Sequence, residues 1–300
     1  MTISRRVLLG GMATGLGAIP LRATSIAPAA WGNFGLEIEG ARLTQGGWLR
    51  GRVIKPEQIT ALRLGEVAVV PDENGRFFIG FDRDAGDVAF LTAACKTSAP
   101  CAGRLDAVTR EKPQFGFSIA PRKWQIERIN APFRPPALPD VDFARIRKGE
   151  LAQIAAARSM ISDAAGWRQN FVWPLKGALR GRFGAQRIYR GTPGAYHAGL
   201  DISGATGTPF TAPADGVVTL AAAAPFTLEG NLLIIDHGSG LSSAFLHCSQ
   251  LAVKPGDRVR QGQLLGWVGK TGRTTGPHLH WALKWRDTRL DPLLFVTPQG

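Results

Sequence analysis

All five histidines of the chain lie in its last 104 residues, and two of them, His278 and His280, are one residue apart. On a β-strand, side chains at positions i and i+2 point to the same face, so both imidazoles would lie on one side of a sheet, about 6–7 Å apart. One ring can then bind a metal ion while the other faces whatever the metal binds. A single histidine on an apolar strand is more often a packed residue than a ligand, so the pair needs partners elsewhere in the chain.

A second group provides such partners. His197 and Asp201 are four residues apart, and in an extended chain they share a face and can converge on one ion. With one nitrogen of the His278/His280 pair they form a set of two nitrogens and one oxygen. Three protein ligands leave the fourth position of a tetrahedral zinc ion open, which is the arrangement of a catalytic site. By itself, however, the His-x-x-x-Asp spacing is common by chance.

Three motifs, in order along the chain, carry a resemblance to a known family. They are H-A-G-L-D at 197–201, F-L-H-C-S at 245–249 and G-P-H-L-H-W at 276–281. Their types, order and spacing resemble those of the lysostaphin/LytM-type zinc endopeptidases, which cleave peptide crosslinks of bacterial peptidoglycan. Glycine-bearing turns between the motifs match as well, so the resemblance covers residues 172–297. Cys248 departs from it, because the family usually has leucine there.

The resemblance implies a role for each residue of the three motifs. His197, Asp201 and His280 would bind one Zn²⁺ per chain, and His247 and His278 would flank the water that the ion activates. Zinc lowers the pKa of bound water to about 7 and polarises a carbonyl, so no serine or thiol nucleophile is needed. The fifth histidine, at position 237, is expected in a turn and is given no role.

The expected function is hydrolysis of peptide crosslinks in peptidoglycan, with the stem peptides as substrate. The D-Ala–diaminopimelate bond is predicted, because the N-terminal signal described below, without a wall-sorting motif, indicates a Gram-negative type of exporter. Two other functions stay open. The chain could be a catalytically silent LytM-type protein that activates other cell-wall hydrolases, or a wall-binding β module with incidental histidines. The complete ligand set favours the enzyme, and cell-division or wall-remodelling proteins are candidate partners.

Composition agrees with a globular protein that does not bind nucleic acid. The 300 residues are 44% hydrophobic and carry a net charge of +13. A length of this size favours two domains. The positive charge is spread along the chain, with +3 in residues 1–30, +4 in 31–171 and +6 in 172–300. A nucleic-acid-binding protein would instead be expected to concentrate lysine and arginine in one stripe.

The first thirty residues have the pattern of an export signal. Arg5 and Arg6 precede an apolar run from Val7 to Leu21, and small residues around Ala29 fit a cleavage site. The twin arginines resemble a twin-arginine signal, a receptor-read address. We therefore expect an exported, periplasmic protein with no stable membrane span after signal removal. Retention of the signal as an inner-membrane anchor is the alternative.

The rest of the chain predicts a mainly β fold in three parts. Short alternating runs at 31–120 predict a small β-sandwich-like accessory domain, in which Cys95 and Cys101 could pair in an oxidising compartment. Residues 121–170 predict a proline-rich linker and a connecting α-helix over 141–165. Glycine-rich turns between apolar runs at 171–300 predict an antiparallel β-sheet zinc peptidase domain.

Overall fold

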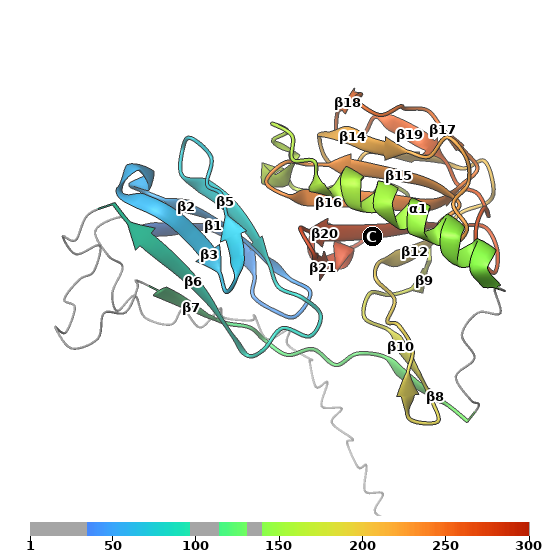
Figure 1. Cartoon of the computed structure of the whole chain (residues 1–300), viewed down its shortest axis with the longest axis horizontal. Helices are drawn as coiled ribbons and strands as arrows, with labels where there is room; N and C mark the ends of the chain where they lie inside the picture. Colours follow the sequence, from blue (N-terminus) through green and yellow to red (C-terminus); the bar gives the residue numbers. More distant parts are fainter. Residues whose placement is uncertain (1–34, 97–113, 131–139, 300) are drawn as a thin grey trace, which may run out of the picture.

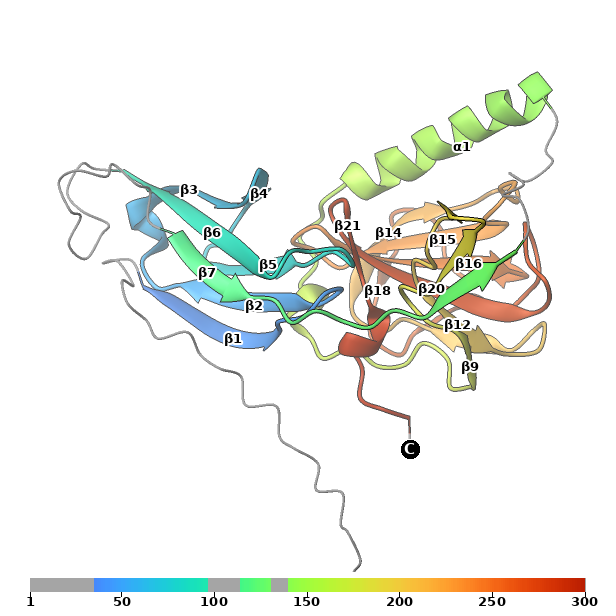
Figure 2. The same cartoon turned by 90° about the horizontal axis from the view of Figure 1, so that it is seen from below.

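The computed structural model describes residues 35–96, 114–130 and 140–299 (Figure 1). The predicted export signal at 1–30 lies outside the described residues, as does Cys101 of the predicted Cys95–Cys101 pair. Within the described part of the chain, no helix is both long enough and apolar enough to cross a membrane. The predicted mainly β fold class is confirmed: strands dominate, and one α-helix connects two β-rich units (Figures 1 and 2).

The N-terminal unit consists of two antiparallel sheets packed on each other. One has the order β1-β2-β5 and the other the order β4-β3-β6-β7. Their bounds are β1 (Leu36–Arg42), β2 (Trp48–Val53), β3 (Ile59–Leu64), β4 (Val67–Val69), β5 (Arg76–Gly80), β6 (Val88–Cys95) and β7 (Gln114–Ser118), with a 3-10 turn at Pro56–Gln58. The apolar run at 61–70 reads as one strand but forms two, because Gly65 turns the chain with a φ of +54°.

The C-terminal unit is built on one eight-stranded antiparallel sheet. Its order is β18-β14-β15-β16-β20-β12-β9, and β21 pairs with β20. These strands are β9 (Leu179–Gly181), β12 (Leu200–Ser203), β14 (Gly216–Ala221), β15 (Asn231–Asp236), β16 (Leu241–Cys248), β18 (Arg258–Val259), β20 (His278–Trp285) and β21 (Thr288–Leu290). A smaller sheet, β13-β19-β17, is formed by β13 (Pro209–Thr211), β17 (Gln250–Leu251) and β19 (Leu264–Trp267). Turns of 3-10 helix at Gly166–Arg168 and Pro292–Leu294 flank this unit.

Strand β20 shows how the sheet separates core from site. Its burial alternates strictly along the strand: Leu279, Trp281, Leu283 and Trp285 are buried, whereas His278, His280, Ala282 and Lys284 face the other side. Alternate side chains of a strand point to opposite faces, so a single strand can anchor the core with one face and present chemistry with the other. The apolar face packs into the main hydrophobic core.

Helix α1 (Asp140–Ser159) crosses the open face of the large sheet (Figures 1 and 2). Ala157 and Ile154 pack with side chains of β15 and β16 in a second, smaller apolar cluster. The helix is shorter than the predicted 141–165. It ends at Ser159 because the following segment is held extended, with the backbone N–H and the hydroxyl of Ser162 both donating to Asp236 at 2.6 and 2.7 Å.

The two units share a continuous apolar core. The ring centroids of Trp48 and Phe295 are 5.4 Å apart, and Trp48 Nε1 donates to the carbonyl of Leu294 at 3.0 Å. A Cβ at Gly80 would meet a methyl group of Leu290 at 2.7 Å, so β5 and β21 approach closely only because Gly80 has no side chain. The division of the chain into an accessory domain at 31–120 and a peptidase domain at 171–300 stays a prediction.

The chain between the two units adds a strand to the C-terminal unit. Strand β8 (Ile126–Ile129) pairs in parallel with β10 (Gln186–Tyr189), which in turn pairs with β11 (Thr192–Pro193). This small sheet forms an arm beside β12 (Figure 1). The linker therefore forms part of the small sheet that precedes the motif at 197–201 in the chain.

Candidate metal centre and active site

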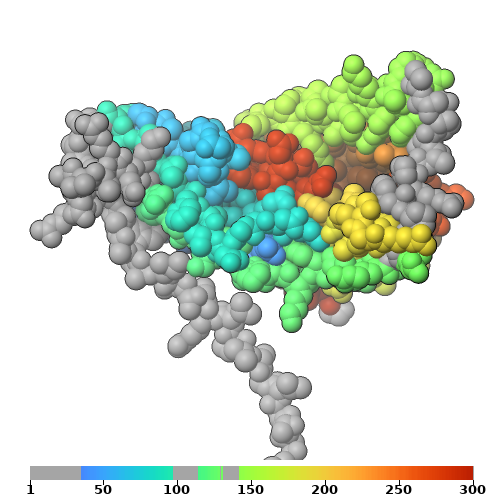
Figure 3. Space-filling view, turned by 60° about the horizontal axis from the view of Figure 1, so that its bottom comes forward, coloured from blue at the N-terminus to red at the C-terminus, as the bar shows by residue number. Residues whose placement is uncertain are grey.

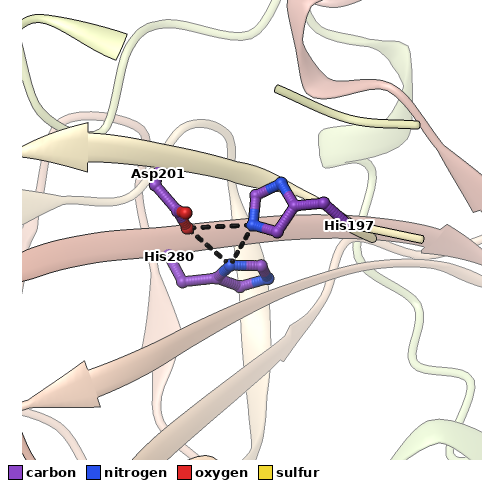
Figure 4. A group of neighbouring side chains, drawn as sticks. All are labelled: His197, Asp201 and His280. Atoms are coloured by element: carbon purple, nitrogen blue, oxygen red, sulfur yellow. Dashed lines mark hydrogen bonds and ion pairs between the residues drawn. The ribbon is translucent and has the colours of Figure 1, made fainter. Parts of the chain in front are cut away.

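Three side chains of the C-terminal unit converge on one point (Figure 4). His197 Nε2 lies 3.0 Å from Asp201 Oδ1 and 3.1 Å from His280 Nδ1. His280 Nδ1 lies 2.9 Å from the same Asp201 oxygen. The three predicted ligands are therefore brought together, each offering one ligand atom.

The donor set fits a tetrahedral zinc ion. Ligand atoms about 2.0–2.1 Å from such an ion are ~3.3 Å from one another, and the three distances here are close to that value. Two imidazole nitrogens that both face a carboxylate oxygen also supply the nitrogen and oxygen donors that zinc accepts. The arrangement leaves one coordination position unfilled by the protein, as a catalytic zinc site requires.

The sheet register fixes two of the three ligands. Asp201 of β12 and His280 of β20 are directly opposite one another in the antiparallel pair, so their side chains emerge side by side on one face. Gly181 of β9 is paired with Asp201 on the other side, and a Cβ there would meet Asp201 Oδ2 at 2.3 Å. Gly181 thus makes room for the carboxylate, a role that nothing in the sequence indicated.

Backbone contacts orient the third ligand. His197 Nδ1 lies 3.1 Å from the carbonyl oxygen of Arg182, which can only accept, so Nδ1 carries the proton and Nε2 faces the centre. Burial alone would favour the neutral Asp201, but its contacts with the rings of His197, His278 and His280 outweigh this effect and hold the pKa of Asp201 well below its usual range. The carboxylate is therefore present as an anion.

The N-terminal unit supports the segment that carries His197. Arg83, which is only 6% exposed, donates from Nε to the carbonyl of Gly184 at 3.1 Å, and its guanidinium lies 4.7 Å from the centre of the Tyr196 ring. The amide of Gly184 in turn donates to the carbonyl of His197 at 2.9 Å. Arg83 therefore reaches the metal centre through one intervening residue.

His278 lies on the same face of β20 as His280, and its ring approaches the carboxylate of Asp201. Its Nδ1 contacts the carbonyl oxygen of Gly276 at 2.9 Å, so this nitrogen is the donor. Its Nε2 is 3.5 Å from Asp201 Oδ1, and the contact with Asp201 raises the pKa of His278 despite burial. His278 is thus next to the three converging atoms but not among them.

His247 reaches the same face through a β-bulge. Leu233 pairs with Phe245 and Asn231 with Cys248, so β16 has one residue more than β15 in this interval. Such a bulge re-aims a side chain, and His247 has a φ of +64° here. Its ring centroid lies 5.1 Å from that of His278.

The hydrogen bond of His247 sets its tautomer. Its Nδ1 donates to the carbonyl of Thr271 at 2.8 Å, which leaves Nε2 as the free nitrogen. Burial lowers the pKa of His247. The two predicted catalytic histidines therefore stand together beside the centre, each held by a backbone carbonyl.

Two further residues named from the sequence lie away from the site. His237 is fully buried between the carbonyl of Asp215 and the hydroxyl of Ser243, both at 2.7 Å, and burial lowers its pKa to about 4. Cys248 is fully buried, and burial raises the pKa of its thiol to about 12. Both are core residues.

A cavity of about 790 Å³ adjoins the centre. One wall is helix α1, the floor is the open face of β16 and β20, and His280 lies at one end. Figure 3 shows this hollow between the helix and the arm that contains residues near 190. The candidate centre therefore borders this groove through His280, the one of its three converging residues that lines it.

The fold and the site together define a metallopeptidase-like domain, and comparison with known proteins gives the family. Residues 195–292 match peptidase family M23. This match over residues 195–292 bears out the resemblance carried by the three motifs.

Individual relatives share this domain. The chain is 34% identical over 148 residues to the cell division protein DipM of Caulobacter vibrioides, covering 49% of this chain and 23% of that protein. It is 43% identical over 89 residues to the peptidoglycan DD-endopeptidase ShyA of Vibrio cholerae, covering 30% and 20%. The chain thus spans about a quarter or less of the length of these relatives.

A solved structure extends the likeness beyond the domain. A Pseudomonas aeruginosa protein named for peptidase M23 superimposes with a TM-score of 0.61 at 25% identity. The superposition covers 86% of this chain and 96% of that one. Since family M23 matches only residues 195–292, the overall arrangement of the N-terminal unit is shared with this protein as well.

Proposed function

We propose that this protein is a zinc-dependent endopeptidase that hydrolyses peptide crosslinks of bacterial peptidoglycan. The observation that carries the proposal is the convergence of His197, Asp201 and His280 within hydrogen-bond distance of one another, with two further histidines beside them. The match of residues 195–292 to peptidase family M23, and the name of the Vibrio cholerae relative as a DD-endopeptidase, support the same reaction and substrate.

Zinc, when bound, would lower the pKa of water and polarise the carbonyl of the scissile bond. His197, Asp201 and His280 would hold it with one atom each. Asp201 supplies a full negative charge, because its pKa is held low, and the carbonyl of Arg182 fixes the tautomer of His197. The chain therefore provides a rigid set of ligands that needs no rearrangement to accept the ion.

His247 and His278 would handle protons. Each is bound through Nδ1 to a backbone carbonyl, so each presents Nε2 to the space beside the ligands. A neutral ring can take a proton at Nε2 from the attacking water, and a ring that is then protonated at both nitrogens can donate from Nε2 to the oxyanion or to the leaving amine.

The D-Ala–diaminopimelate crosslink is the proposed bond, and the periplasm is the proposed compartment. Both follow from the twin-arginine-like pattern of residues 1–30. Cell-division or wall-remodelling proteins are proposed as partners, and the name of the Caulobacter relative supports a link to division.

Digestion of purified sacculi by the zinc-loaded full chain tests this function. Mass spectrometry of the soluble muropeptides should show crosslinked dimers converted to monomers cut between D-Ala and diaminopimelate. A chelator should stop the reaction, and added zinc should restore it. A folded protein that binds one zinc per chain but leaves every crosslink intact would instead indicate a silent activator of other hydrolases.

A further inference from the structure

The open face of β20 leads from the metal centre to a row of cations. His280 is followed on this face by Ala282 and Lys284. Lys284 is paired in register with Ser242 of β16 on one side and with Arg289 of β21 on the other. Four residues of strand separate His280 from Lys284, which corresponds to about 13–14 Å. The cations therefore lie along the groove and not in the centre itself.

Helix α1 adds a further cation to this row. Arg158 Nη1 donates to the hydroxyl of Ser242 at 3.0 Å, which places the guanidinium next to Lys284. Arg158, Lys284, Arg286 and Arg289 all line the cavity that adjoins the metal centre. We call these four residues the cationic pocket.

Acidic side chains do not balance the cationic pocket. Among the described residues, one carboxylate lies within 4.0 Å of a charged nitrogen of the four: Asp287 Oδ1, 3.7 Å from Lys284 Nζ, on a side chain that is fully exposed. Arg147, farther along the cavity, is already paired with Glu229 at 2.6 Å. The side chains that line the cavity therefore carry an excess of positive charge.

Burial and mutual repulsion act on these cations. Burial, reinforced by the charge of Arg289, lowers the pKa of Arg158 to about 10. Burial and the charge of Arg158 lower the pKa of Lys284. A bound anion stabilises like charges that lie close together, because it supplies the partner that they lack.

We propose that the cationic pocket is a substrate subsite that binds a free carboxylate of the peptide stem while the scissile bond lies at the metal centre. This inference rests on the proposed endopeptidase function. Extended peptide advances about 3.4 Å per residue, so a carboxylate bound in the pocket lies up to about four residues from the cleaved bond. Stems with D-glutamate and diaminopimelate carry such groups, whereas a glycine bridge has none. The subsite would therefore select acidic stems.

One member of the pocket comes from outside the matched family domain. Arg158 belongs to α1, whereas the match to family M23 covers residues 195–292. The connecting helix would thus contribute to substrate selection.

Kinetics with a matched pair of substrates test the subsite. The substrates are a diaminopimelate-type crosslinked muropeptide dimer and the same dimer with its stem carboxylates amidated, each treated with the zinc-loaded full chain. Amidation should raise KM about 10-fold or more, the range expected for loss of a charged hydrogen bond, with little change in kcat. Lys284→Ala and Arg158→Ala should raise KM for the free acid by a similar factor and have no added effect on the amidated dimer. Lys254→Ala, which removes an exposed lysine from a distant loop, should match the wild type with both substrates.

A binding measurement separates failure of the subsite from failure of the enzymatic function. Calorimetry would follow the tripeptide L-Ala–γ-D-Glu–diaminopimelate and its amidated form, which contain no scissile crosslink. Equal KM values for acid and amide, or wild-type KM values in both pocket variants, would overturn the subsite and leave the endopeptidase standing. The opposite outcome is that the dimers stay uncleaved while the tripeptide binds, and that this binding is lost on amidation and in both variants. This outcome would support the subsite and contradict the proposed endopeptidase activity.

Discussion

The two β units of this chain use the faces of their sheets in opposite ways. In the N-terminal unit, β5 is buried at four successive positions, Phe77 to Gly80, because one face packs in the sandwich and the other against the C-terminal unit. In the C-terminal unit, β20 alternates between buried and accessible positions along its whole length. Both units form a core of aromatic and aliphatic side chains. The second face of β5 packs at the interface between the units, whereas the second face of β20 carries the side chains of the site.

The difference between β5 and β20 shows which strands of a sheet can carry a functional site. Apolar residues on both faces of a strand fix two units together and leave no polar group to act on a substrate. A strand with one polar face can place several functional groups at intervals set by the backbone, as His278 and His280 show. In this chain, the continuously buried β5 lies at the interface between the units, and the alternating β20 carries two histidines of the site.

Removal of a ligand is expected to have the largest effect on the catalytic face. His280→Ala, His197→Ala and Asp201→Ala should each lose most bound zinc and nearly all hydrolysis of sacculi, because two remaining ligands hold the ion weakly. Elemental analysis of the purified variants beside a cleavage assay measures both properties. If all three variants keep one zinc per chain, the metal lies elsewhere.

Removal of a neighbouring ring should separate turnover from metal binding. His278→Ala and His247→Ala should keep the zinc and lose about 10²–10⁴-fold in kcat, the usual size of a general acid–base contribution. Elemental analysis for zinc and the sacculus cleavage assay measure the two properties. Loss of metal from His278→Ala with retention in His280→Ala would reverse the assignment of ligand and proton carrier.

A methyl group behind the ligands should disturb the catalytic face without removing any functional group. Gly181→Ala places a Cβ 2.3 Å from Asp201 Oδ2, so the carboxylate must shift and the affinity for zinc should fall. A loss of about 10–100-fold is expected, as for other changes that misplace a metal ligand. Gly86→Ala, where no atom lies within 4 Å of the new Cβ, is the matched control. Competition with a chromogenic chelator measures the affinity, and equal values for both variants would contradict the close fit at Gly181.

The interface face should respond in stability and not in catalytic chemistry. Phe295 contacts Trp48 and Phe171 with ring centroids at 5.4 and 5.3 Å and is 7% exposed. Phe295→Ala should lower the free energy of unfolding by about 3–5 kcal/mol, as for other buried phenylalanines. Denaturant titration gives this value. A kcat well below that of the wild type in the folded variant would show that the interface also shapes the site.

The smallest effect concerns the buried histidine outside the site. The folded-state pKa of His237 is about 4, below the unfolded value of about 6.5, so the fold favours the neutral ring. Its contribution to stability is complete above pH 6.5 and falls as pH drops toward 4, by on the order of 3 kcal/mol. His237→Asn should show a shallower fall over this window than the wild type. Urea titrations at pH 4.5 and 7 measure the free energy of unfolding of both proteins. An equal loss between these pH values in the variant and the wild type would show that His237 does not titrate in this way.

Strand periodicity explains how far the sequence could predict the site. His278 and His280 on one face follow from alternation. The approach of His197 to Asp201 does not follow from it, because His197 lies outside β12 and is oriented by the carbonyl of Arg182. His247 does not follow, because regular alternation would send it to the face opposite Leu246, and only the bulge in β16 brings it back. The motif resemblance identified the residue without explaining its position.

Long-range packing explains what the sequence could not give. The helix was predicted to continue to 165, but the contact of Ser162 with Asp236, 74 residues later, ends it sooner. The cationic pocket combines Arg158 with Lys284, whose proximity depends on how the helix crosses the sheet. Neither contact has a local signal.

Because Arg83 contacts Gly184 and Gly184 contacts His197, we expect metal binding to be coupled to the packing of the two units. A ligand that binds better to the docked form stabilises docking by the same free energy by which docking improves its binding. Zinc should therefore slow hydrogen exchange of amides around Arg83, in a unit that holds none of the metal's ligands. The accessory β-sandwich would then report, through its own local unfolding, whether the peptidase has acquired its metal.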